Sequence, residues 1–188
     1  MTDATDLMAH AARLLDRLEA LLPPAPAAPD WEAHAFRWRR DGRGQGRLQA
    51  LVHPQRLLLK DLLCLDRQKA EILRNSRQFL AGRGANNILL WGSRGTGKSS
   101  LIKAIFNELR HEGLRLIEMD KDELVDLPAV LDLIHGRPER FIIFCDDLSF
   151  EASESGYKAL KAALEGSISA APDNLLIYAT SNRRHLLP

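Results

Sequence analysis

The chain has 188 residues, with 26 lysines and arginines against 25 aspartates and glutamates and a formal net charge of +1 at pH 7. This length allows one stable domain, or one domain plus an extension, and the balanced charge excludes a chain-wide attraction to nucleic acid or to anionic membranes. Two cysteines, Cys64 and Cys145, are too few for a disulfide framework or a cysteine-based metal site. We expect both thiols to be reduced.

The N-terminal stretch lacks the features of an export signal or a membrane anchor. Charged residues such as Asp6, Arg13 and Asp16 interrupt its apolar positions. No apolar run approaches the roughly 20 residues that a transmembrane helix needs. We therefore expect a cytoplasmic location and no membrane partner.

Residues 1–22 are predicted to form a separate amphipathic helix, followed by a proline-rich linker over residues 23–30. Apolar residues recur in the first stretch at steps of three and four: Leu7, Ala11, Leu14, Leu18 and Leu21. The linker holds four of the nine prolines and is read as an extended spacer. Because the polar face of the helix is acidic as well as basic, docking on protein is favoured over a membrane surface. The partner is a surface of the same chain or of another subunit.

Residues 31–56 are predicted to form a basic and aromatic hairpin. Phe36 and Trp38 alternate with arginines, and a glycine-containing turn separates them from Leu48. Two interpretations remain open, a packed hairpin with a solvated basic face and a nucleic-acid contact in which rings stack on bases. The second would use the arginines at five positions, Arg37, Arg39, Arg40, Arg43 and Arg47. We favour the packed hairpin.

The most informative stretch is a phosphate-binding loop between an apolar run, Ile88–Trp91, and a helical pattern that begins at Lys98. The loop satisfies G-x-x-x-x-G-K-[ST], in which backbone N–H groups and a helix N-terminus surround phosphate. Lys98 supplies a cation for the β and γ phosphates, and the Ser99 hydroxyl can ligate Mg²⁺. The predicted nucleotide-binding residues of the loop are Gly92, Ser93, Arg94, Gly95, Thr96, Gly97, Lys98, Ser99 and Ser100.

The rest of residues 57–188 alternates between helical and strand patterns, which predicts a doubly wound α/β fold with a parallel sheet. Helices are expected in three stretches, within 57–80 and from Asp126 to Gly136 and Tyr157 to Leu164. For the second of these we predict an apolar face of Ala129, Leu131 and either Leu133 or Ile134. Further strands are expected at Leu114–Met119, Phe141–Cys145 and Leu175–Ala179.

Polar residues end two of these apolar strands, where ligands bind in such sheets. Asp146 and Asp147 follow the predicted strand Phe141–Cys145. Asn182 comes shortly after the last predicted strand, following Thr180 and Ser181. Asp146 is predicted to hold Mg²⁺ and Asp147 to polarise the attacking water, while Asn182 orients that water or the γ-phosphate. The predicted catalytic residues are thus Lys98, Asp147 and Asn182, and the predicted metal ligands are Ser99 and Asp146.

Four stretches, GSRGTGKSS, FIIFCDDLSF, YKALKAALEG and IYATSNRRHLLP, together resemble a bacterial family of AAA+-type ATP-binding proteins of unassigned function, domain of unknown function 815. The resemblance runs from about Phe36 to the C-terminus and implies an AAA+ ATPase core that uses ATP or ADP with Mg²⁺. By position, the loop matches Walker A, the acid pair matches Walker B and Asn182 matches sensor 1. Leu62 and Leu63 lie where AAA+ proteins commonly contact adenine.

The sequence departs from the AAA+ pattern in two places. Most AAA+ proteins have glutamate at the position of Asp147, although helicase-loader-like members also carry Asp-Asp. The chain stops at Pro188, before a fifth strand and helical lid, so we expect a fragment without the sensor 2 residue or the arginine finger. Arg183 and Arg184 are interpreted as turn or interface residues.

The resulting hypothesis is a slow Mg-ATP-dependent AAA+ ATPase that couples hydrolysis to remodelling of a partner or of its own oligomer. The alternative is a nucleotide-gated binding module, acting on DNA or protein, with little hydrolysis. A small-molecule kinase of the phosphate-loop class is less favoured, because no acceptor pocket is recognisable and Asn182 would have no role.

Overall fold

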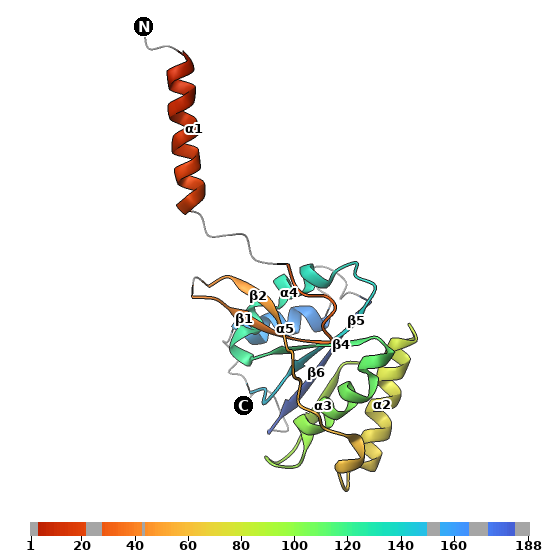
Figure 1. Ribbon diagram of the computed structural model, residues 1–188. Helices are drawn as coiled ribbons and strands as arrows, with labels where there is room; N and C mark the ends of the chain where they lie inside the picture. The colour runs from red at the N-terminus through yellow and green to blue at the C-terminus, as the bar shows by residue number, and fades with distance from the viewer. Residues whose placement is uncertain (1–3, 22–27, 43, 150–154, 166–172, 183–188) are drawn as a thin grey trace.

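The structure is a computed structural model that describes residues 4–21, 28–42, 44–149, 155–165 and 173–182, and the statements below concern these residues. Six strands form one sheet in the order β2-β1-β4-β5-β6-β3 (Figure 1). The strands are β1 (Ala35–Arg40), β2 (Gly46–Ala50), β3 (Ile88–Trp91), β4 (Leu114–Met119), β5 (Arg140–Cys145) and β6 (Leu175–Ser181). All neighbouring strands are parallel except β1 and β2, which form an antiparallel hairpin.

The helices are α1 (Ala4–Leu21), α2 (Asp66–Leu80), α3 (Lys98–Leu109), α4 (Leu127–Ile134) and α5 (Ser155–Glu165). Short 3-10 turns occupy Leu59–Asp61, Arg110–Glu112 and Lys121–Asp126. In α1 the side chains of Met8, Leu14 and Leu15 are exposed. In the described part of the chain, no helix combines the length and apolar character that crossing a membrane requires.

Helices cover both faces of the sheet, as the alternation of patterns predicts. Alternate residues of β5 show this arrangement, because Ile142 packs in the cluster with α2 and α3, whereas Ile143 packs in the cluster with α4 and α5. β6 is buried along its whole length and β5 is buried after its first residue. The continuous apolar sequence of these strands therefore reflects two buried faces. The predicted α/β fold class is confirmed.

The strand β3 lies at one edge of the sheet in the described part of the chain, with β6 beside it. Its residues alternate between two environments, as expected for a strand. Ile88 and Leu90 are partly buried against the cluster with α2 and α3. Leu89 and Trp91 point to the other face and are 38% and 56% exposed.

The buried face of α4 agrees in part with the one predicted, because Ile134, one of the two predicted alternatives, is buried. The structure buries Leu127, Val130 and Ile134, whereas Ala129 and Leu133 are exposed. Leu131 is partly buried, as expected. Val130 and Ile134 pack in the buried cluster that also contains Leu124 of the preceding turn, Lys121–Asp126, and the local pattern does not specify this packing. A capping box formed by Asp120 and Glu123 fixes that turn.

The hairpin of β1 and β2 extends the sheet by the parallel pairing of β1 with β4. Phe36 and Trp38 are 0% and 2% exposed, and they pack with β4 and α4. The indole N–H of Trp38 donates to Asp126 Oδ2 over 2.9 Å. The aromatic side chains predicted here are therefore core residues.

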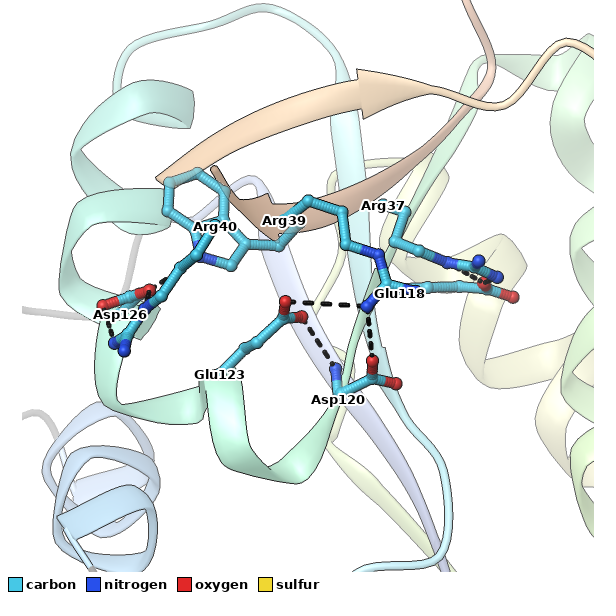
Figure 2. A network of polar contacts seen from close by, with 8 residues as sticks. Arg37, Arg39, Arg40, Glu118, Asp120, Glu123 and Asp126 are labelled. Carbon is cyan, nitrogen blue, oxygen red and sulfur yellow. Dashed lines mark hydrogen bonds and ion pairs between the residues drawn. The ribbon is translucent and has the colours of Figure 1, made fainter. Parts of the chain in front are cut away.

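Three arginines of β1 form ion pairs with acids of β4 and the turn that follows it (Figure 2). Arg37 pairs with Glu118 over 2.5 Å, and Arg39 pairs with Asp120 over 2.9 Å. Arg40 pairs with Asp126 over 2.6 Å and makes two hydrogen bonds to its carboxylate. Much of the basic character of the hairpin is thus neutralised within the chain, which agrees with the packed-hairpin interpretation.

The ion pair of Asp126 makes stability depend on pH. The hydrogen bonds from Arg40 and Trp38 lower the pKa of Asp126 below its ordinary value of 3.8. A carboxylate with a depressed pKa stabilises the fold above that ordinary value, and the contribution is lost as pH falls through the lowered pKa. We expect Asp126→Asn to reduce the free energy of unfolding at pH 7, with the reduction shrinking below about pH 4.

Urea unfolding of wild type and variant across that range measures the effect, and Asp132→Asn, at an exposed position of α4, is the matched control. A reduction of the same size at pH 7 and in acid would contradict this account of Asp126.

The pairing of the arginines also predicts how the hairpin behaves toward nucleic acid. Three of the five arginines, Arg37, Arg39 and Arg40, already contact carboxylates and have little charge to offer phosphates, and Arg43 lies outside the described residues. We therefore expect no binding of a labelled single strand at about 50 mM salt. Fluorescence anisotropy at about 50 and 200 mM salt tests this expectation. Strong binding that falls steeply with salt, and that Arg47→Glu on the exposed side of β2 abolishes, would restore the nucleic-acid interpretation.

Candidate functional site

The strands β3, β5 and β6 are parallel, so their carboxyl ends lie at the same end of the sheet. Trp91 at the end of β3 pairs with Ser181 of β6, and Cys145 at the end of β5 pairs with Ala179. The residues that follow these strands therefore emerge close together, which is where open α/β sheets bind ligands. They form a cavity of about 300 Å³. Its lining residues are Arg94, Gly95, Thr96, Gly97, Lys98, Ser99, Ser100, Asp146, Asp147, Thr180 and Asn182.

The glycines of the loop give it its shape. Gly95 and Gly97 both have φ of +83°, a conformation that residues with a Cβ rarely adopt. Gly97 directly precedes α3, whose N-terminus has no side-chain cap and no acidic residue in its first turn. The amide groups of this turn are therefore available to an anion, and the helix dipole favours negative charge at the same place.

The ammonium group of Lys98 lies inside the loop and is held by three oxygen atoms. Lys98 Nζ donates to the carbonyl oxygens of Gly92 and Ser93 over 2.7 and 2.8 Å. It also donates to Asn182 Oδ1 over 3.2 Å. These contacts fix the positive charge at the floor of the cavity and connect the loop to the end of β6.

Asp146 connects the loop to β5 and β6. Its Oδ1 accepts hydrogen bonds from Ser99 Oγ and Thr180 Oγ1, each over 2.5 Å. A carboxylate beside a hydroxyl is a set of hard oxygen ligands, and Mg²⁺ binds proteins through one or two carboxylates together with waters and phosphates. The residues therefore fit Mg²⁺. The described residues hold no cluster of three or more histidine, cysteine, aspartate or glutamate side chains for a metal bound by protein alone.

Asp147 has an unusual backbone conformation, with φ of +52°. Its Oδ1 accepts a hydrogen bond from the Asn182 amide over 2.5 Å, so its carboxylate turns toward the end of β6. The Asn182 side chain thus contacts Lys98 through its oxygen and Asp147 through its nitrogen. Since the amide oxygen and nitrogen have different partners, the orientation of Asn182 is defined.

The structure brings together most of the residues predicted from the sequence. Gly92 and Ser93 act through their carbonyl groups on Lys98, and the other predicted loop residues line the cavity. Leu62 and Leu63 do not line it. Leu62 is partly buried against the cluster with α2 and α3, and Leu63 is 79% exposed.

Thr180 is a site residue that the sequence reasoning did not identify. It is 1% exposed, and its hydroxyl contacts both Asp146 and the backbone of Asp147. The available signal was a hydroxyl residue at the end of a buried strand, two positions before Asn182. Parallel strands that pair side by side place such a residue against the acids of the neighbouring strand.

The fold and site define an α/β protein with a glycine-rich G-x-x-x-x-G-K-S loop after β3 and an acid pair after the buried strand β5. An amide follows β6, the strand between them, and all three groups line one cavity. The chain belongs to the family described as protein of unknown function DUF815, whose model matches residues 31–188. The resemblance expected from the four sequence stretches is confirmed. No curated protein sequence matches the chain.

Among solved structures, the chain is similar to AMPPCP-bound DnaA from Aquifex aeolicus, with a TM-score of 0.48 and 20% sequence identity. The similarity covers 68% of this chain and 42% of the DnaA chain. The matched part of this chain therefore spans less than half of that DnaA chain.

Proposed function

We propose that this protein binds ATP with Mg²⁺ and hydrolyses it slowly, as an AAA+-type ATPase domain. The observation that carries the proposal is the convergence of five side chains on one cavity, connected by hydrogen bonds: Lys98, Ser99, Asp146, Asp147 and Asn182. A phosphate loop alone supports nucleotide binding. The acid pair and the amide add groups that phosphoryl transfer requires.

Binding would rest on the loop and the start of α3. The amides of residues 95–99 and the Lys98 ammonium offer donors and positive charge to the β and γ phosphates. Ser99 and Asp146 would hold Mg²⁺, which supplies charge neutralisation on the phosphate oxygens. We assign the adenine contact to Leu62 and Leu63. This assignment follows from the family resemblance, and the nearby Leu65 lies beside the loop, with its Cδ1 3.3 Å from the position that a Cβ on Gly97 would take.

Hydrolysis would depend on Asp147 and Asn182. The Asp147 carboxylate can accept a hydrogen bond from the attacking water and polarise it. The Asn182 amide holds that carboxylate in place over 2.5 Å and touches Lys98 over 3.2 Å. Asn182 is therefore suited to sense the γ-phosphate through Lys98 and, at the same time, to orient Asp147 as the general base. We propose that this response couples to remodelling of a partner or of a homo-oligomer in the cytoplasm.

One observation favours a second candidate, a nucleotide-gated binding module with little hydrolysis. Asp147 is one methylene shorter than the glutamate usual in AAA+ proteins, and one of its carboxylate oxygens is already bonded to Asn182. The carboxylate therefore has less reach toward a water molecule. Phosphate release measured with ATP alone and with added DNA or protein partners separates the two candidates.

The Lys98→Ala variant tests nucleotide binding. Charge-assisted hydrogen bonds contribute about 1.5–3 kcal/mol each, so removal of the ammonium should weaken ATP binding roughly 10- to 150-fold. Calorimetric titration measures this change, and Lys158→Ala on the exposed side of α5 serves as the control. Equal ATP affinities for wild type and Lys98→Ala would contradict the proposal that ATP binds through this loop.

The two acids should separate binding from turnover. Asp147→Asn should keep Mg-ATP binding and lower kcat about 10²- to 10⁴-fold, because it removes the base. Asp146→Asn should instead weaken the part of ATP affinity that depends on Mg²⁺.

Titrations with Mg²⁺ and with EDTA, together with steady-state phosphate release, measure both quantities. If the two variants had the same effect on each, the division of roles between the acids would be wrong.

A further inference from the structure

We infer that Thr180 is a positioning residue that holds both acids of the site through a single hydroxyl group. This inference rests on the proposed function, because it concerns how Asp146 and Asp147 are held for metal and water chemistry. Thr180 is the sixth of the seven residues of β6 and is almost fully buried, at 1% exposure. Its hydroxyl lies against the residues that follow β5.

The hydroxyl makes two hydrogen bonds of opposite sense. Thr180 Oγ1 donates to Asp146 Oδ1 over 2.5 Å and accepts from the backbone N–H of Asp147 over 2.8 Å. A hydroxyl has one donor and two acceptor positions, so both bonds form at once. The first falls in the distance range of charge-assisted O–H···O⁻ bonds, which are about twice as strong as neutral ones. One side chain therefore sets the carboxylate of one acid and the backbone of the other.

The backbone of Asp147 gives this second bond its importance. With φ of +52°, Asp147 is in the left-handed region that residues other than glycine seldom occupy. The surrounding structure must hold such a residue there. The bond from its N–H to Thr180 and the bond from Leu148 N–H to the Thr180 carbonyl oxygen, over 2.7 Å, hold both sides of the turn. The same turn directs the Asp147 carboxylate to Asn182.

The identity of the side chain also fits the role. Threonine is branched at Cβ, so its χ1 angle is restricted and the hydroxyl is fixed in direction. Valine has the same shape without the hydroxyl and would leave the Asp147 N–H without this acceptor and Asp146 with one donor fewer. Serine keeps the hydroxyl and loses only the methyl group.

The test compares Thr180→Val and Thr180→Ser with wild type. Partners that orient metal ligands typically contribute 10- to 100-fold to metal affinity or activity, so Thr180→Val should reduce the Mg²⁺-dependent gain in ATP affinity by about that factor. It should lower kcat by a similar factor, while ATP affinity in EDTA stays within about threefold of wild type. Thr180→Ser should remain within about threefold in all three quantities.

Ser181→Ala is the matched control. Ser181 is the next residue of β6, fully buried, and its hydroxyl donates to the Leu148 carbonyl oxygen over 2.7 Å. Its removal therefore deletes a buried hydrogen bond of the same turn whose acceptor is a backbone carbonyl oxygen and not the carboxylate of either acid. A general loss of stability would affect both variants and would lower affinity in EDTA as well as in Mg²⁺. A loss confined to Thr180→Val and to Mg²⁺-dependent quantities supports the positioning role.

The remaining outcomes are distinct. If wild type binds Mg-ATP and Thr180→Val matches it in Mg²⁺-dependent affinity and in kcat, the inference is wrong and the proposed function stands. If Ser181→Ala shows the same losses as Thr180→Val, the inference is also wrong. If wild type does not bind Mg-ATP, the proposed function is wrong, and the inference, which rests on it, is wrong as well. Circular dichroism checks the fold of each variant, and Thr180→Ala replaces Thr180→Val should the latter not fold.

Discussion

The parallel pairing of β6 with β5 on one side and β3 on the other is the constraint on which the site depends. Its register places Trp91 beside Ser181 and Cys145 beside Ala179, so the loop, the acids and the amide all begin at nearly the same level of the sheet. A slip of one residue in either pairing would turn every side chain to the opposite face and separate Asp146 from Ser99. Since both faces of β6 are buried, the core opposes such a slip.

At the other end of the sheet, ion pairs hold the hairpin of β1 and β2 against β4 and the turn that follows it. The hairpin is joined to β4 by parallel pairing and by ion pairs from Arg37, Arg39 and Arg40 to acids around the end of β4. These contacts make the hairpin part of the same core as α4, with Trp38 buried beneath it. The phosphate loop and the hairpin therefore lie at opposite ends of one sheet (Figure 1).

The local sequence pattern was enough to predict most helices and strands. It was also enough to predict those site residues that directly follow the end of a single strand. The predicted bounds of β3 and β4 agree with the structure to the residue, because glycines and changes of periodicity mark their ends. Pattern could not predict the pairing of β1 with β4, because the arginines of β1 meet acids more than 80 residues away. The role of Thr180 was missed for the same reason, since its hydroxyl contacts Asp146 and Asp147 at sequence separations of 34 and 33 residues.

The three tryptophans of the chain occupy three different environments. Trp38 is buried and hydrogen-bonded to Asp126, and Trp31 is covered by the guanidinium of Arg137 at 3.8 Å from the ring centroid. Trp91 is 56% exposed and directly precedes the first glycine of the phosphate loop. Indole emission shifts to longer wavelength with exposure to water. The long-wavelength part of the intrinsic fluorescence therefore comes chiefly from the loop end of β3, and the short-wavelength part from the core beneath the hairpin.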